Sequence, residues 1–164
     1  MFDERTIRRL ATLNILFVCT GNTCRSPMAE GLFKKLVAEK LGCPADELPA
    51  RGVQIESAGT LGYHGGSASR EAVEVCRRRG VDLSRHASRG LSVELIRSAD
   101  NIYTMAKHHL EVVRSLAPRH AAKAEPLDPD HDIADPLGGA EEEYARVADL
   151  IEAALRRRLL EVDL

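Results

Sequence analysis

Residues 15–26 read Ile-Leu-Phe-Val-Cys-Thr-Gly-Asn-Thr-Cys-Arg-Ser, and this stretch decides how the chain folds. Its first four residues form a short apolar run that is typical of a buried strand in a parallel sheet. A tight loop follows, and then Ser26 and Pro27 open a helix, for which Ser26 is the expected N-cap. Backbone N–H groups of such a loop and of the helix N-terminus converge on one point. The stretch therefore predicts an anion site after the first strand, with the thiol of Cys19 beside it.

The composition fits a single domain. With 164 residues, of which 44% are hydrophobic, the chain can bury one core but is short for two. We expect a polar extension over residues 1–12 and one domain over residues 13–164. The net charge of −2, with acidic and basic residues interleaved, provides no sequence-wide field for nucleic acid or an anionic membrane. We expect neither a signal peptide nor a membrane anchor, and we therefore expect a cytoplasmic protein, which we take to be a monomer.

Short apolar runs alternate with helical stripes along the chain, a pattern typical of strands and helices around a parallel sheet. Strands are expected at residues 14–18, 53–56 and 101–105, with a weaker one at 121–125.

Individual helices are also predicted. Ser92 is expected to cap a short helix, and Pro118 is expected to end a longer one that buries Leu110, Val113 and Leu116.

Cys19 and Arg25 form the pair around which a phosphate site would be built. A free thiol has a pKa of about 8.5, and a helix N-terminus with a neighbouring cation lowers it to roughly 3.5–7.5, which yields a nucleophilic thiolate. Arg25 can hold two phosphoryl oxygens in a planar fork. Gly21 and Asn22 both tolerate the positive φ that a tight loop requires. A core cysteine followed by a surface arginine is the alternative, and the strand before the loop and the helix after it favour the phosphate site.

From the first strand to the final helix, the chain resembles the low-molecular-weight protein tyrosine phosphatase family. The segments that carry this resemblance are residues 18–30, 56–60 and 83–91 and the pair Asp135-Pro136. The resemblance implies a three-layer α/β sandwich whose four parallel strands have the order 2-1-3-4, with the phosphate loop after the first strand. It also implies phosphorylated proteins as substrates and no cofactor.

The resemblance implies a displacement in two steps. Cys19 would attack phosphorus while Asp135 protonates the leaving group, and Asp135 would then activate the water that hydrolyses the phosphocysteine. Arg25 would hold the phosphoryl oxygens, and Ser26 would hydrogen-bond the thiolate. The residues implied for the rest of the phosphate-binding loop are Thr20, Gly21, Asn22, Thr23 and Cys24, and those that would brace it are Ser57 and His86 together with Asn22.

Two positions bear on which phosphorylated side chain is cleaved. Thr23 stands where members acting on phosphotyrosine usually carry a bulky aliphatic residue, and here the chain resembles the protein-arginine phosphatase branch. Leu137 follows Asp135-Pro136 where many tyrosine-specific members carry paired aromatics that stack on a phenolic ring, and where the arginine branch tends to carry phenylalanine. We therefore expect phosphoarginine as the substrate and keep phosphotyrosine as the alternative.

Two other functions are weighed. Arsenate reductases share the loop but relay a disulfide through two further cysteines, whereas Cys43 and Cys76 are well separated here and Cys76 lies on an apolar helix stripe. A redox-sensing phosphate-binding module would use a disulfide between Cys19 and Cys24. We interpret such a disulfide as regulation of an enzyme, because a pure binding module would not need Asp135.

Two patterns that suggest metal binding are set aside. Asp128, Asp130 and Asp132 alternate as in a calcium loop, but the loop lacks the glycine at its sixth position and the closing glutamate. His108 and His109 are adjacent on a helix and point to different faces, so we interpret them as surface or core histidines. We predict no metal site.

Overall fold

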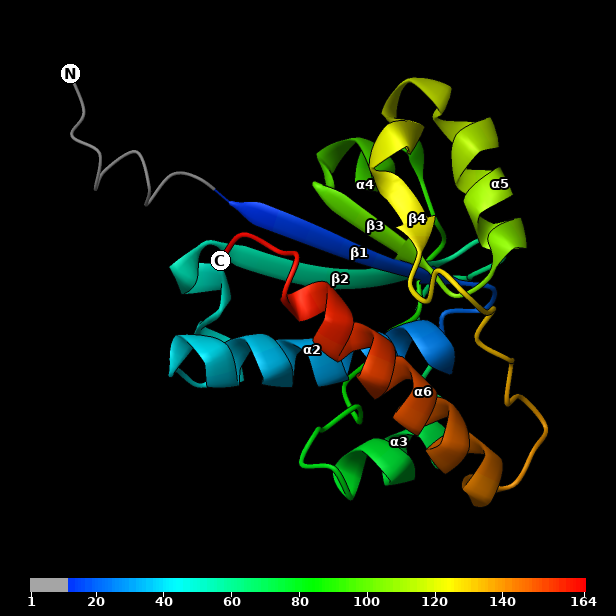
Figure 1. Ribbon diagram of the computed structural model, residues 1–164. Coiled ribbons are helices and arrows are strands. Elements are labelled where there is room, and N and C mark those ends of the chain that lie inside the picture. The colour runs from blue at the N-terminus through cyan, green and yellow to red at the C-terminus, as the bar shows by residue number, and fades with distance from the viewer. Residues whose placement is uncertain (1–11) are drawn as a thin grey trace.

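The computed structural model describes residues 12–164, and its strands form one parallel sheet (Figure 1). The strand order is β2-β1-β3-β4, which confirms the predicted fold class. Apart from Thr12, the expected polar extension lies outside the described residues. The strands are β1 (Leu13–Cys19), β2 (Val53–Gly59), β3 (Asn101–Thr104) and β4 (Ala124–Pro126).

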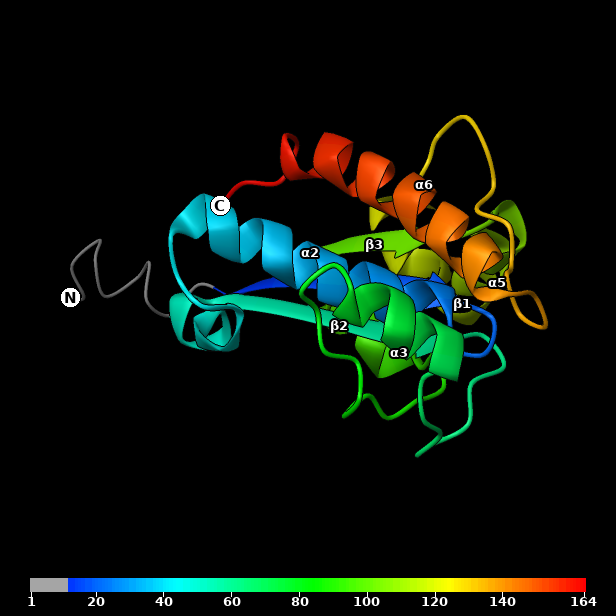
Figure 2. The same cartoon turned by 90° about the horizontal axis from the view of Figure 1, so that it is seen from below.

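Helices cover both faces of the sheet and complete the three layers. One face carries α2 (Arg25–Leu41), α3 (Arg70–Arg77) and α6 (Glu141–Leu159). The other carries α4 (Val93–Ser98) and α5 (Lys107–Leu116). Seen from below in Figure 2, α2 and α6 run next to each other on their shared face, where they are in contact. Short 3-10 helices span Ala45–Glu47, Pro49–Arg51 and Pro118–Lys123.

The central strand β1 places the candidate site. It pairs with β2 on one side and with β3 on the other, so both of its edges are hydrogen-bonded. Its side chains alternate between the two cores: Leu16 and Val18 join the α4/α5 cluster, and Phe17 joins the α2/α3/α6 cluster. The ring of Phe17 packs edge-on against Phe33 and stacks with Tyr103. Because β1 is fixed on all sides, its last residue is held rigidly where the sheet ends.

The prediction that Ser26 caps α2 is wrong. The helix begins at Arg25, its N-cap position is Cys24, and no side chain caps it. Ser26 lies inside the first turn, and its hydroxyl faces the sulfur of Cys19 instead. The first-turn N–H groups thus have no capping side chain, which is the arrangement that suits an anion at a helix N-terminus.

Three other element predictions have mixed outcomes. Ser92 does cap α4, accepting a hydrogen bond from the Leu95 N–H at 3.2 Å. Leu116 was expected to be buried but is 43% exposed, because α5 ends at that residue before Pro118 and leaves it at the rim. The fourth strand is short and begins at Ala124, since a 3-10 helix started by Pro118 takes up the first part of the predicted segment.

Candidate active site

The loop between β1 and α2 is held from outside through its carbonyl groups. Gly59 and the loop approach so closely that a Cβ on Gly59 would lie 2.4 Å from the Thr20 oxygen, so only glycine fits there. Hydrogen bonds from three neighbouring segments then fix the orientation of the loop peptides. These bonds run to the carbonyl oxygens of Cys19 (from Thr60 N, 2.8 Å), Thr20 (from Leu61 N, 2.9 Å), Asn22 (His86 Nε2, 2.7 Å) and Thr23 (from Ser69 N, 2.9 Å).

Asn22 is the centre of the predicted bracing network. Its backbone is left-handed, with φ of 57°, a conformation that asparagine tolerates better than most residues. Its amide nitrogen donates to Ser26 Oγ at 2.8 Å and to Ser57 Oγ at 2.9 Å, and its amide oxygen accepts from Arg89 N at 2.9 Å. Ser57 in turn donates to Glu30 Oε1 at 2.7 Å. The structure therefore brings together the predicted residues Asn22, Ser26 and Ser57, and His86 contacts the same loop through the backbone carbonyl of Asn22.

The sulfur of Cys19 has a hydroxyl beside it. Cys19 is 2% exposed, and its Sγ lies 2.9 Å from Ser26 Oγ. Because the Asn22 amide donates to Ser26 Oγ, the hydroxyl hydrogen of Ser26 is free to donate to the sulfur. This is the contact that a thiolate nucleophile requires.

Arg25 joins the phosphate loop to the loop that carries Asp135. The buried guanidinium donates through Nη1 to the carbonyl of Ile133 at 2.7 Å. Its Nη2 lies 3.4 Å from Thr20 Oγ1 and 3.6 Å from Asp135 Oδ2. The Asp135 side chain is 45% exposed, and its other oxygen accepts from Leu137 N at 3.1 Å. With Nη1 occupied, the edge formed by Nε and Nη2 remains for phosphoryl oxygens.

The second cysteine of the loop points toward α6. Cys24 Sγ lies 3.3 Å from the hydroxyl of Tyr144 and 3.5 Å from that of Ser69. Burial and the hydrogen bond to Cys24 raise the pKa of Tyr144 to about 12, so the phenol stays protonated and can donate. Cys19 and Cys24 are both free and buried here, and the expected disulfide between them stays a prediction.

The remaining cysteines are explained by packing. Cys76 is fully buried in the core under α3, and desolvation raises its pKa to about 12. A thiol with that pKa is a poor nucleophile at neutral pH. Cys43 is half-buried at the edge of the same core. The environment of Cys76 therefore weakens the disulfide-relay alternative.

The two specificity positions differ in their surroundings. Thr23 is half-buried in the loop, with Oγ1 3.8 Å from Cys24 Sγ. Leu137 is 68% exposed beside Asp135, and glycine follows it. The loop between β4 and α6, residues 127–140, carries Asp135 and is called the acid loop from here on. At Leu137 it presents an aliphatic side chain to solvent and no aromatic ring that could stack on a tyrosyl substrate.

Among the residues that sequence reasoning missed are two side chains, on α6 and α5, that contact the phosphate loop. Tyr144 is buried in α6, and its contact with Cys24 was not predicted. His109 was interpreted as a core or surface histidine, and it is buried with Nε2 2.8 Å from Thr20 Oγ1. The only sequence signal for His109 is its place on the inward face of the helix, since the contact depends on how α5 meets the loop.

A doubly covered parallel sheet with a thiol at the end of its central strand, a buried arginine and a carboxylate from a second loop defines a thiol-dependent phosphatase. Residues 14–163 match the low molecular weight phosphotyrosine protein phosphatase family, and the chain belongs to this family. It is therefore a phosphoprotein phosphatase.

The names of relatives in this family state two different substrates, phosphorylated arginine and phosphorylated tyrosine. The chain is 37% identical to the protein-arginine-phosphatase of Bacillus subtilis over 88% of its own length and 93% of that protein. A structure of the arginine phosphatase YwlE, mutated to carry a phosphorylated active-site serine, has a TM-score of 0.80 at 36% identity and covers 92% of this chain and 97% of that one. A low molecular weight protein tyrosine phosphatase from T. tengcongensis has a TM-score of 0.81 at 33% identity, with 92% and 100% covered.

Among residues 12–164, no helix combines the length and the apolar character needed to span a bilayer.

Proposed function

We propose that this phosphatase hydrolyses phosphoarginine in proteins, with Cys19, Arg25 and Asp135 as its catalytic residues. The observation that carries the assignment of residues is their convergence: the Cys19 sulfur 2.9 Å from a serine hydroxyl, and the buried Arg25 guanidinium 3.6 Å from Asp135. Each group comes from a different part of the site, namely a strand end, a helix start and a loop after β4. Such convergence is what nucleophilic displacement at phosphorus needs.

The reaction would proceed through a phosphocysteine. Cys19 attacks phosphorus and forms the S–P bond as the bond to the leaving group breaks, and Arg25 binds the equatorial oxygens as charge spreads over them. Asp135, partly open to solvent, gives its proton to the leaving nitrogen or oxygen. The same carboxylate then takes a proton from water, which attacks phosphorus and releases Cys19 and inorganic phosphate. The hydrogen bond from Arg25 to the carbonyl of Ile133 holds the guanidinium in place before substrate binds, which supports precise orientation of the phosphoryl group.

Two features support phosphoarginine over phosphotyrosine. Thr23 offers a hydroxyl and limited apolar bulk beside the loop, which suits a polar guanidinium better than a phenyl ring. The exposed Leu137 provides no aromatic stacking partner for tyrosine. The name of the Bacillus subtilis relative points the same way.

The test compares peptides that carry phosphoarginine with matched peptides that carry phosphotyrosine, under reducing conditions. Cys19→Ser is the blank, and Cys43→Ser, outside the loop, is the control expected to keep wild-type turnover. A higher kcat/KM on phosphoarginine supports the proposal. A preference for phosphotyrosine would overturn the substrate assignment but not the mechanism, and turnover by Cys19→Ser equal to wild type would overturn the mechanism.

We further propose that residues 13–164 act as one domain and that the protein is a cytoplasmic monomer without nucleic-acid partners. The shared sheet and the two cores beside it support a single folding unit. The four free cysteines suit a reducing compartment, and the near-neutral charge gives nucleic acid little to bind. A molar mass near 18.0 kDa by light scattering and one unfolding transition are the expected results.

A further inference from the structure

The imidazole of His109 is buried in the first turn of α5 with a partner at each nitrogen. Nδ1 is 3.0 Å from the backbone nitrogen of Ala106, whose N–H donates to it. Nε2 is 2.8 Å from Oγ1 of Thr20, which lies in the phosphate loop between β1 and α2. No part of this side chain reaches solvent. A histidine fixed at both ends and touching the residue after Cys19 has more contacts than core packing alone requires.

The two contacts determine the tautomer. A backbone N–H can only donate, so Nδ1 must carry a lone pair, and a neutral imidazole then has its hydrogen on Nε2. His109 therefore donates to Thr20 Oγ1. Burial, with smaller effects from His108 and Arg25, lowers the pKa of His109 to about 4, and this keeps the ring in the neutral form that the geometry needs.

Of the Thr20 hydroxyl, only the hydrogen remains free to make another hydrogen bond. Its oxygen faces two donors, Nε2 of His109 and, at the longer distance of 3.4 Å, Nη2 of Arg25. Both lone pairs of the oxygen are thus directed at donors, and its hydrogen is the part that remains. Thr20 is therefore set as a hydrogen-bond donor inside a loop that already gathers donors for an anion.

The start of α5 also holds the loop that carries the general acid. The N–H of Lys107 donates to Asp132 Oδ1 at 3.0 Å, and the N–H of Ile133 donates to the carbonyl of Met105 at 2.8 Å. Ile133 is the residue whose carbonyl anchors Arg25. One short segment, residues 105–109, therefore contacts the acid loop directly and the phosphate loop through His109.

We propose that His109 is a positioning residue that orients the Thr20 hydroxyl to donate a hydrogen bond to an oxygen of the bound phosphoryl group. The inference rests on the proposed function, in that it assumes that the loop binds phosphate. It extends that function, because Thr20 becomes a direct phosphate ligand and His109 acts only through it.

Binding of inorganic phosphate, measured by titration calorimetry, tests this independently of turnover. Thr20→Val removes the hydroxyl at nearly constant shape and is expected to weaken phosphate about tenfold, the loss of about one hydrogen bond. His109→Phe is expected to weaken it by a similar factor. Thr20→Ser, which keeps the hydroxyl, and His109→Gln, whose amide keeps a donor toward Thr20, are expected to stay within about threefold of wild type.

A double-mutant cycle separates positioning from a structural role. If His109 acts through Thr20, the double variant with Thr20→Val and His109→Phe should bind phosphate about tenfold more weakly than wild type. Independent effects would multiply to a loss of about a hundredfold in phosphate affinity. His109→Gln and His109→Phe both remove the acceptor of the Ala106 N–H, so both should lower the unfolding temperature, but only Phe should lower phosphate affinity. His120→Gln, in the 3-10 helix Pro118–Lys123 that follows the far end of α5, is the control and should change neither quantity.

Several outcomes would overturn the inference. A hundredfold loss in the double variant, wild-type phosphate affinity in folded His109→Phe, or equal losses in the Gln and Phe variants would each do so. Failure of the proposed function is recognised separately. If the phosphate-binding results are as expected but the wild-type protein hydrolyses neither the phosphoarginine peptide nor the phosphotyrosine peptide, the positioning role of His109 stands and the catalytic proposal is refuted.

Discussion

Asn22 combines two requirements that few residue types meet together. Its backbone is left-handed, and its side chain uses two donors and one acceptor to join Ser26, Ser57 and Arg89. Glycine would accept the backbone conformation but would leave these partners without bonds. Aspartate would replace donors by acceptors and set a negative charge beside the thiol. The shape of the loop and the orientation of Ser26 toward Cys19 therefore depend on the same side chain.

Thr23→Ile should move activity from phosphoarginine toward aryl phosphates. The change replaces a hydroxyl by apolar bulk of similar branching, which removes a polar contact for a guanidinium and adds a wall for a ring. We expect the ratio of kcat/KM for phosphoarginine to that for phosphotyrosine to fall about tenfold or more. Paired assays on the two peptides measure this ratio. Parallel losses on both substrates would show that Thr23 does not determine specificity.

Cys76→Ser should leave catalysis unchanged. Cys76 is fully buried with a pKa of about 12, so it is not poised to relay a disulfide. Serine introduces a buried hydroxyl, and we expect a loss of about 1 kcal/mol in the free energy of unfolding together with wild-type phosphatase turnover. Any arsenate reduction coupled to thioredoxin should also persist in the variant. Reduction that disappears with Cys76 would restore the reductase alternative.

At this scale, the sequence predicted the residues that lie within one motif. Cys19, Arg25 and the loop between them are adjacent in the chain, so their chemistry is visible without the fold. The capping role assigned to Ser26 was wrong, because the bond from Asn22 and the nearby sulfur outweigh capping in that first turn. His109 and Tyr144 could not be assigned to the site, since each reaches the loop from a distant helix.

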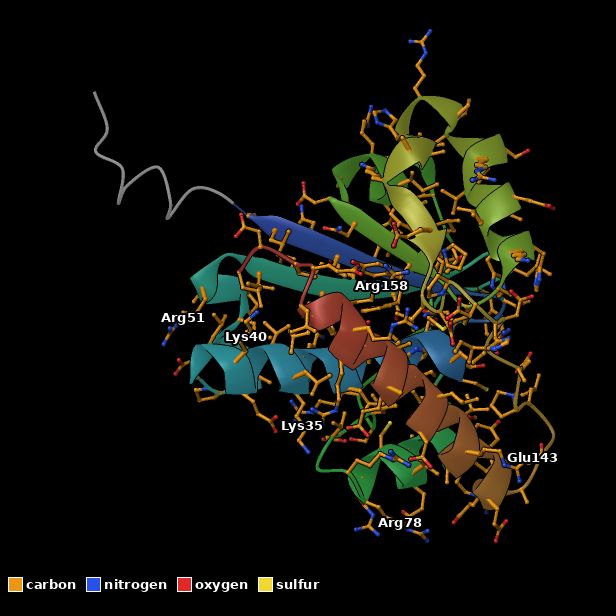
Figure 3. The ribbon with its side chains drawn as sticks, in the orientation of Figure 1. Lys35, Lys40, Arg51, Arg78, Glu143 and Arg158 are labelled. Atoms are coloured by element: carbon orange, nitrogen blue, oxygen red, sulfur yellow. The ribbon has the colours of Figure 1, made fainter. Side chains whose placement is uncertain are left out.

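Among the elements, α6 is fastened to the sheet through a buried arginine. Three arginines at residues 156–158 stand in the last turn of α6, where cations complement the helix dipole, yet Arg158 is buried between α6 and the sheet (Figure 3). It donates to the carbonyls of Pro126 at 2.7 Å and Leu127 at 3.0 Å, and its guanidinium lies 5.1 Å from the ring centre of Tyr103. These carbonyls stand where β4 ends and the acid loop begins. Periodicity marks residue 158 as inward, but only the packing shows what it binds.

Arg158→Met should destabilise the protein and disturb the acid loop. Methionine fills much of the volume but leaves the carbonyls of Pro126 and Leu127 without their donor, which we expect to cost about 3 kcal/mol in unfolding free energy. Because Asp135 follows on the same loop, kcat should fall below that of wild type at temperatures where the variant is folded. Urea denaturation and steady-state kinetics measure the two effects.

The adjacent residue supplies the matched control for this prediction. Arg157 is exposed, and its only ion pair among the described residues joins Nη1 to Asp130 Oδ2 at 3.5 Å on the surface. Arg157→Met should therefore change the unfolding free energy by about 0.5 kcal/mol or less. Equal losses in the two variants would contradict the proposed role of Arg158 as a fastening between α6 and the start of the acid loop.

For the molecule as a whole, the strand order was accessible from sequence because a family resemblance and the alternating pattern agreed. The weakest prediction was the last strand, whose residues Ala124–Pro126 lack a long apolar run and depend on β3 for pairing. Sequence reasoning could not predict which residues of the helices and loops contact one another at the end of the sheet. The junction of β3 with α5 joins both functional loops, and this follows only from the register of β1 against β3.

That junction gives the whole protein a pH dependence of stability with a defined sign. His109 has a folded-state pKa of about 4 against an ordinary value of 6.5, and the groups facing it are His108, Arg25, Asp132 and Asp135. Below pH 6.5 the imidazole of residue 109 is protonated in the unfolded chain but stays neutral in the folded chain until the pH approaches 4. The contribution of His109 to the free energy of unfolding is therefore fully present above pH 6.5 and is lost as the pH falls toward 4. Between pH 7 and pH 5 this loss amounts to as much as about 2 kcal/mol.

Urea denaturation of wild type and His109→Gln at pH 7 and pH 5 isolates this effect. The variant starts less stable at pH 7, because Ala106 loses its acceptor, but it should lose less stability on acidification. Glu74, whose pKa is lowered to about 2 by its hydrogen bond to Arg77, changes stability only below pH 4.5 and contributes equally to both proteins. The control His120→Gln, whose residue lies in the 3-10 helix Pro118–Lys123, should follow wild type. Equal pH slopes for wild type and His109→Gln would mean that His109 is protonated in the folded protein, and the donor arrangement at Thr20 would then have to be abandoned.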